Sequence, residues 1–115
     1  MAKNRNLEYG RQISVPVASG TLSGDPVAVG QIPGVAVVDR NSAGNATVQF
    51  DGVYNLSVKG IDGSGNAAVA VGDVLYYTAG DTPPVSKKAT GVRFGYALDA
   101  VTSGATATIR VKVGY

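Results

Sequence analysis

The 115-residue chain contains no cysteine, no histidine and no tryptophan. These absences exclude disulfides, zinc sites built from cysteine and histidine, and catalytic pairs in which a histidine activates a serine or cysteine. The net charge is only +2, and its charges are scattered, whereas nucleic-acid binding needs a clustered basic face. No apolar run has the length of a membrane span. We therefore expect no nucleic acid, membrane, metal, cofactor or small-molecule substrate.

Large side chains are also scarce, because aromatic residues make up 7% of the chain and Val and Ala supply most of the apolar content. Val favours strands, since its branched Cβ fits a pleated surface. The 16 glycines indicate frequent turns. This composition predicts short, closely packed strands.

Alternation of apolar and polar residues is clearest near the C-terminus, where Ile109, Val111 and Val113 share one face. Val48 and Phe50 alternate in the same way. Further runs of strand length, separated by Gly- and Asn-rich turns, are Gly34–Asp39, Tyr54–Gly60 and Val92–Val101. A marginal helix is possible at Asn66–Val71.

One order of elements occurs twice. A Gly-Asp pair opens an apolar run, a Gly-led run ends near an Asp, and a Gly turn leads to a strand that begins Ala-Thr. The two copies read GDPVAV, GVAVVD and ATVQF, then GDVLYY, FGYALDAV and ATIRVKV. We predict an all-β fold, a small compact β-barrel or sandwich built from two similar three-stranded units over residues 21–115.

Residues 1–20 stand outside this pattern. They are polar and basic at first, then alternate weakly through Ile13, Val15 and Val17. Pro16 favours an edge strand or an extended segment. Residues 1–10 lack the apolar core of a secretory signal. We predict an extended N-terminal arm over residues 1–20, and a protein that acts in the cytoplasm or in a particle assembled there.

No constellation of residues indicates catalysis. The stretch GDTPPVSKK has prolines where a phosphate-binding loop needs backbone donors, so it does not fit that motif. The acidic residues stand singly beside glycines, as turn formers do. Tyr76 and Tyr77 point to opposite faces of a strand, which predicts one core ring and one surface ring. A strand-and-turn chain without a chemical site favours binding to another protein over catalysis.

The quoted motifs, in this order and spacing, resemble the small phage head-decoration proteins, or capsid cement proteins, from about Ser23 to the C-terminus. Some members of that family carry a recombinase-like label, which the missing ATP-binding loop does not support. The resemblance implies a non-enzymatic protein of tulip or clip type. Such proteins bind the outside of an assembled capsid, commonly as trimers, and brace the junctions between capsomers.

The partners implied are the phage major capsid protein and further copies of the chain in a homotrimer, and the implied location is the virion after synthesis in the host cytoplasm. The resemblance also implies that the arm binds the capsid. We expect its contacts to come from Lys3, Arg5, Leu7, Tyr9, Arg11, Ile13 and Val15.

Two other classes stay open at this point. A carbohydrate- or cell-surface-binding module would need aromatic rings grouped on one face, for which the candidates are Tyr54, Tyr76, Tyr77 and Tyr96. A hydrolase that uses carboxylates alone would need two acidic side chains that face each other in a pocket.

Overall fold

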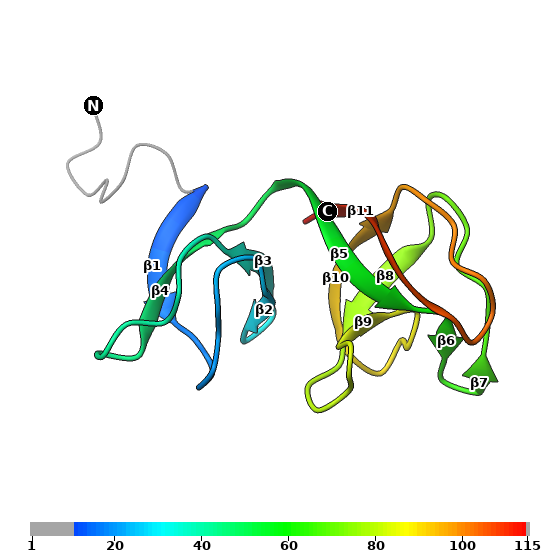
Figure 1. The fold of residues 1–115 in the computed structure, drawn as a ribbon, viewed down its shortest axis with the longest axis horizontal. Coiled ribbons are helices and arrows are strands. Elements are labelled where there is room, and N and C mark those ends of the chain that lie inside the picture. The colour runs from blue at the N-terminus through cyan, green and yellow to red at the C-terminus, as the bar shows by residue number, and fades with distance from the viewer. Residues whose placement is uncertain (1–10, 115) are drawn as a thin grey trace.

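Two β-sheets lie side by side along the long axis of the molecule, which measures 49 × 32 × 22 Å (Figure 1). The computed structural model describes residues 11–114, which contain eleven strands and no helix, and so no helix that could cross a membrane. The predicted all-β class is confirmed. The strands are β1 (Gln12–Pro16), β2 (Pro26–Val29), β3 (Ile32–Ala36), β4 (Asn45–Gln49), β5 (Gly52–Lys59), β6 (Ile61–Asp62), β7 (Gly65–Asn66), β8 (Val74–Tyr77), β9 (Val85–Ser86), β10 (Val92–Ala97) and β11 (Thr106–Val113).

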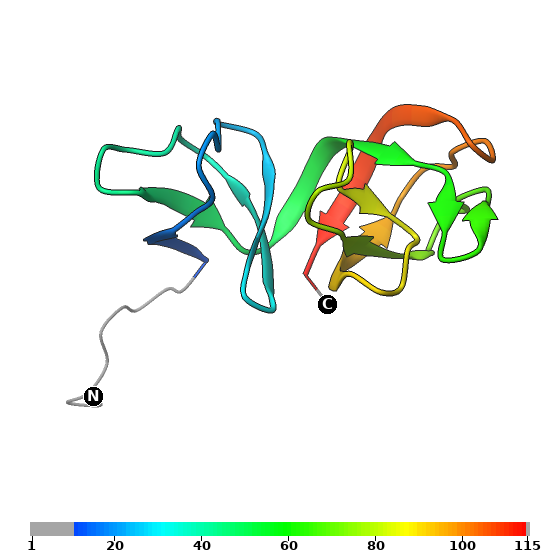
Figure 2. The ribbon, with the colours of Figure 1, turned by 90° about the horizontal axis from the view of Figure 1, so that it is seen from below.

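The first sheet has the order β1-β4-β3-β2, and all its neighbours are antiparallel. The second sheet is a closed barrel in the order β10-β11-β5-β9-β8, in which only the β5–β9 pair is parallel. The small β6–β7 hairpin lies at the end of the barrel far from the first sheet (Figures 1 and 2). Only Phe50 and Asp51 separate β4 from β5, so one almost continuous run connects the two sheets.

The two sheets repeat one topology. In the first, β4 pairs with β3 and β3 with β2; in the second, β11 pairs with β10 and β10 with β8. The predicted pair of three-stranded units is therefore confirmed. Each unit also has a fourth strand, since β1 pairs with β4 and β5 pairs with β11. The first unit is thus β1–β4, and its counterpart is formed by β5, β8, β10 and β11.

Hydrogen bonds fix which residues of the two units are equivalent. The Gly24 N–H donates to the Ala36 carbonyl at 2.7 Å, and the Gly72 N–H donates to the Ala97 carbonyl at 2.7 Å. Both glycines have φ near 90°, a conformation that favours glycine over every other residue. The repeated Gly-Asp pair therefore sets the same turn at the entry of β2 and of β8.

The aspartate of each Gly-Asp pair closes that turn. The Asp25 carboxylate accepts a hydrogen bond from the Leu22 N–H at 3.0 Å, and the Asp73 carboxylate accepts one from the Ala70 N–H at 2.8 Å. Asp73 has a further partner, because the Lys87 Nζ lies 3.1 Å from its carboxylate. The hydrogen bond from Ala70 holds the pKa of Asp73 below its ordinary value, with Lys87 adding to this effect and partial burial opposing it.

A second pair of equivalent glycines brings the central strands close to their neighbours. Gly34 in β3 and Gly95 in β10 are both buried. A Cβ on Gly95 would collide with the backbone carbonyl of Lys112 in β11, and a Cβ on Gly34 would collide with the Val48 side chain of β4. Each unit can therefore curl tightly only because its third strand has no side chain at this point.

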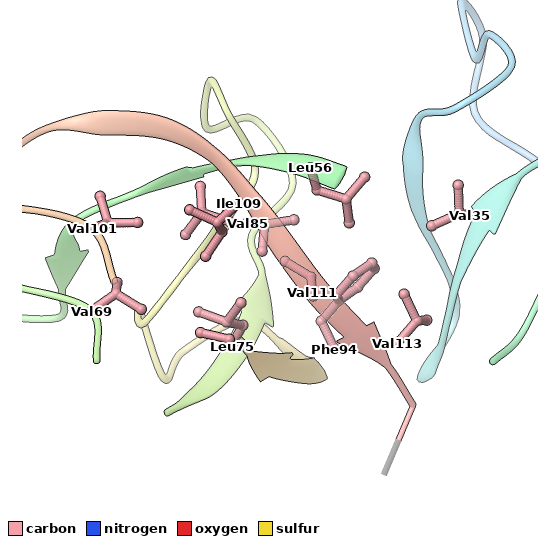
Figure 3. Close-up of a cluster of buried hydrophobic side chains, with 12 residues drawn as sticks. Val35, Leu56, Val69, Leu75, Val85, Phe94, Val101, Ile109, Val111 and Val113 are labelled. Carbon is pink, nitrogen blue, oxygen red and sulfur yellow. The ribbon is translucent and has the colours of Figure 1, made fainter. Parts of the chain in front are cut away.

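The main core fills the barrel (Figure 3). Phe94 and Leu75 are its largest fully buried side chains. Ile109, Val111 and Val113 point inward, as their alternation predicts. Its other fully or nearly buried members are Val35, Leu56, Val58, Val69, Val85, Ala97 and Val101. Val35 is the one member from the first sheet, and it packs between the two units.

A smaller cluster lies within the first sheet. Val27, Ala36 and Val48 are buried there. Val15, Val17, Val29 and Phe50 pack against them but are only half-buried. The two units thus share a topology while differing in how completely they cover their apolar residues.

The possible helix at Asn66–Val71 is not formed. Asn66 ends the two-residue strand β7, and Val69 is buried and forms an isolated bridge with Val101. Val69 belongs to the barrel core, and its burial outweighs the weak helical preference of so short a segment.

Replacing Gly95 by Ala should lower the free energy of unfolding by about 2–3 kcal/mol, as overpacking against backbone does. Urea unfolding measures the effect. Gly63→Ala is the matched control, because a Cβ at Gly63 meets nothing within 4 Å. Equal midpoints for the two variants would show that β10 does not approach β11 as closely as described.

Asp73→Asn should flatten the acid dependence of stability. The folded-state pKa of Asp73 is lowered, so the unfolded chain binds the proton more tightly. The stabilisation by its carboxylate is present at pH 7 and is lost as the pH falls through the ordinary value of about 3.9 toward the folded-state value. Urea midpoints at pH 7 and pH 3 should differ less in Asp73→Asn than in the wild type. An unchanged difference would contradict the assignment.

Candidate capsid-binding region

The predicted arm residues fall into two groups. Lys3, Arg5, Leu7 and Tyr9 lie outside the described residues. Arg11 is the first described residue and is exposed. Its Nε lies 3.5 Å from the Asp51 carboxylate, and both side chains are more than half exposed. An exposed ion pair of this kind contributes about 0.2–1 kcal/mol, so Arg11 can exchange Asp51 for another acidic group.

The second group, Ile13 and Val15, lies in a different position from the one expected. These residues belong to β1, which pairs with β4 over its whole length, from Gln12 opposite Gln49 to Pro16 opposite Asn45. Both side chains are half-buried, and Val15 packs against the smaller cluster. Ile13 and Val15 therefore hold β1 in the protein's own sheet. The predicted arm over residues 1–20 accordingly includes one strand of the first unit.

Pro16 explains why the sequence alone did not distinguish an extended arm from an edge strand at β1. Proline suits both an extended arm and the outer strand of a sheet, since it lacks an N–H. The structure places it at the end of β1, which is an edge strand among the described residues. The base of the arm is fastened further where the Phe50 N–H donates to the Arg11 carbonyl at 2.8 Å. Residues 1–10 therefore continue from an anchored edge strand.

Several large apolar side chains are exposed, and the sequence analysis did not single them out. Among residues 11–114, Leu22, Ile32, Val38, Val53 and Val71 each expose about half or more of their surface. Leu22, Ile32 and Val38 belong to the first unit or its loops. Val38 looked like part of a buried apolar run, but it follows the end of β3 and lies beside Asp39, whose carboxylate accepts the Ser23 N–H at 2.8 Å. Single exposed apolar residues of this kind are common on protein surfaces.

The tyrosines do not form one binding platform. Tyr77 packs against the main core with its ring 6.4 Å from that of Phe94, and burial raises its pKa. Tyr54 also packs against the main core. Two of the four rings that a carbohydrate site would use therefore serve the fold.

Tyr96 belongs to a different kind of surface. The Arg93 guanidinium lies 5.6 Å from the centre of its ring, and the Lys112 Nζ lies 5.9 Å from it. These residues lie on the neighbouring strands β10 and β11. Both cations therefore lie over one aromatic ring on the barrel.

The carboxylates of residues 11–114 do not gather into a metal site, since no group of three or more acidic side chains is close enough to hold an ion. Among the described residues, the acidic side chain with the most side-chain hydrogen bonds from a cation is Asp99, and its ion pair with Arg110 stabilises the fold. Arg110 donates to Asp99 through both Nε and Nη2, at 3.1 and 3.0 Å, and the hydrogen bonds from this side chain hold the pKa of Asp99 below its ordinary value. Asp99 thus fixes the end of β10 against β11.

Comparison with known proteins adds the observation that decides the family. A family model described as phage cement protein matches residues 7–113. The chain belongs to the phage cement protein family. The resemblance predicted from the sequence motifs is confirmed. No curated protein and no solved structure matched the chain.

As a member of this family, the chain has a structural role at the phage capsid. The match begins within the predicted arm and ends at the last residue of β11, so it covers both units. The two-unit body described above is therefore the body of a cement protein.

Val15→Asp should lower the free energy of unfolding by about 1–3 kcal/mol, because it places a charge against the smaller apolar cluster. Ser14→Asp is the matched control, since Ser14 is the exposed neighbour in the same strand, and it should change stability by about 0.5 kcal/mol or less. Urea unfolding of both variants measures the difference. If Val15→Asp were as stable as Ser14→Asp, β1 would not be packed as described.

Proposed function

We propose that the chain binds the outside of an assembled phage capsid as a homotrimer and stabilises the junctions between capsomers. The observation that carries this proposal is the family match over residues 7–113, which identifies a cement protein. The structure supports it with a two-unit body in which β1, the first described strand, forms the outer strand of the first sheet. The major capsid protein is the proposed partner.

The body suits bracing because its two units are joined in two ways. The chain runs from β4 into β5 across only two residues, and Val35 of β3 packs against the barrel core. Pulling the units apart would expose Val35 and the residues it contacts. In this body β1, from which the arm continues, belongs to the sheet that packs against the barrel.

The arm supplies the capsid contact in this proposal. We assign it to residues 1–11, with Lys3, Arg5 and Arg11 meeting acidic groups and Leu7 and Tyr9 filling apolar pockets. Ten extended residues span roughly 33 Å, which is enough to reach the edge of a neighbouring sheet. Ile13 and Val15 stay in β1 and serve as the anchor of the arm.

Three arms on one trimer explain how modest contacts can hold firmly. Once one arm is bound, the second and third bind at a high effective concentration, provided that the capsid presents matching three-fold positions. An isolated capsid subunit offers only one such contact. The trimer therefore prefers the assembled shell.

Deleting residues 1–10 should leave a folded protein that no longer binds capsids. The deletion stops before β1, so both sheets keep every strand of the described residues 11–114. Co-sedimentation with empty expanded shells of the phage's major capsid protein measures binding, and urea unfolding checks the fold. A matched control replaces Lys3 and Arg5 by Gln at unchanged arm length and should weaken binding less than the deletion does. Normal decoration by the truncated protein would overturn the arm mechanism.

A further inference from the structure

The two units differ in one place. In the second unit, β9 lies between β5 and β8 and closes the barrel. The first unit has counterparts of β5 and β8, namely β1 and β2, but among residues 11–114 no strand lies between them. The outer edges of β1 and β2 therefore border a space that is filled in the other unit.

The apolar residues around this space show what is missing. In the β1–β4 pair, Val15 lies opposite Ala46, and in the β5–β11 pair, Leu56 lies opposite Ile109. Val15 is therefore the counterpart of Leu56. Two residues later in each chain segment, Val17 is the counterpart of Val58. Leu56 and Val58 are at most 4% exposed, and Val85 of β9 is buried beside them in the same core. Val15 and Val17 are only half-buried.

The β2 side of the space shows the same deficit. The equivalence of Gly24 and Gly72 makes Val29 the counterpart of Tyr77, which pairs with Val85. Val29 is also only half-buried. Among residues 11–114, the first unit thus has no inward apolar side chain in the position that Val85 fills.

We propose that an extended segment of the capsid protein occupies this space, antiparallel to β2 and parallel to β1, as β9 does in the barrel. This inference rests on the proposed capsid-binding function. It adds a second contact, in which the cement protein receives a strand as well as extending its arm.

Strand direction argues that the occupant comes from another molecule. A strand parallel to β1 in the same sheet needs a connection of a dozen or more residues. Any strand within residues 1–10 would be joined to Gln12 by fewer than a dozen residues, so these residues do not supply it. The remaining described residues are already placed elsewhere in the fold.

Charge indicates the chemistry of the occupant. In the barrel, Lys87 follows Val85 by two residues and its Nζ lies 3.1 Å from Asp73. Asp25 is the counterpart of Asp73, and no cation of residues 11–114 lies within ion-pair distance of it in the structure. We therefore expect an occupant with an apolar side chain facing Val15, Val17 and Val29 and a Lys or Arg two residues later.

A cavity lies where that cation would enter. It has a volume of about 270 Å³ and is lined on one side by Ala18–Thr21 and the start of β2, at Asp25 and Pro26. Tyr77 and Pro84 of the barrel line the other side. A strand running antiparallel to β2 passes Val29 first and then Asp25, so its later residues point into this cavity.

Hydrogen bonding at the open edges favours β2 as the pairing strand. On the β1 side, the Ala18 carbonyl, two residues beyond the end of β1, already accepts a hydrogen bond from the Thr21 hydroxyl, whose Oγ1 lies 2.7 Å away. Ala28 faces Pro33 in β3, and proline has no N–H, so the Ala28 N–H points away from β3 toward the open edge. Its counterpart Tyr76 pairs with Ser86 of β9.

Ala28→Pro tests the proposal because it removes the edge N–H while keeping the β2–β3 pairing, as proline does on edge strands. Ala28→Thr is the matched control and keeps the N–H. In co-sedimentation with empty expanded capsid shells, we expect Ala28→Pro to bind about tenfold more weakly than the wild type, and Ala28→Thr to bind as the wild type does. Asp25→Asn should also weaken binding. Equal binding by Ala28→Pro would overturn the proposal.

Hydrogen exchange of the wild type gives a second measurement that does not depend on the folding of a variant. The Ala28 and Gly30 amides should become protected when shells are added. Absence of protection, with binding intact, would overturn the strand contact and leave the arm contact standing. Failure of the wild type to bind shells would instead overturn the proposed function. If Ala28→Pro abolished self-association, the occupant would be a second copy of the chain, which also contradicts the proposal.

Discussion

The packing of Val35 against the barrel core is the contact on which the joining of the two units depends. This residue belongs to the first sheet but lies with Phe94 and Val113 in the cluster that fills the barrel (Figure 3). Without it, β1–β4 would be a small sheet with a thin core of its own, tied to the barrel by two residues of chain. With it, the first unit packs against the barrel core. The proposed capsid contacts need a body in which the two units are joined in this way.

The repeat explains both what the units share and where they differ. Equivalent glycines, Gly34 and Gly95, permit the same curl, and equivalent aspartates, Asp25 and Asp73, close the same turn. The barrel completes this plan with β9, whereas the first unit leaves its edges open within the described residues. One unit therefore supplies stability, and the other keeps a surface that a partner can complete.

Much of this fold could be predicted from the sequence because its signals are local. Alternation identified the buried faces of β4 and β11, and the doubled Gly-Asp order identified the recurring unit. Contacts between distant residues could not be predicted in this way. Val85 and Ser86 form a strand only because β5 and β8 lie on either side of them. The two prolines that precede them in the sequence indicated a loop. For the same reason, β1 looked like part of an arm, since its partner β4 begins about thirty residues later. The residues proposed to contact the capsid follow from the resemblance and stay a prediction.

The hydrogen bond from Phe50 to Arg11 has a mechanical consequence. Phe50 is one of the two residues between β4 and β5, so tension applied to the N-terminal segment reaches the bridge between the sheets directly. The load then passes along β5, whose full-length pairing with β11 shares it among many backbone bonds. The turns and the open edges of the first sheet lie off this route. A pull from a swelling shell would thus be carried by the best-paired strands of the molecule.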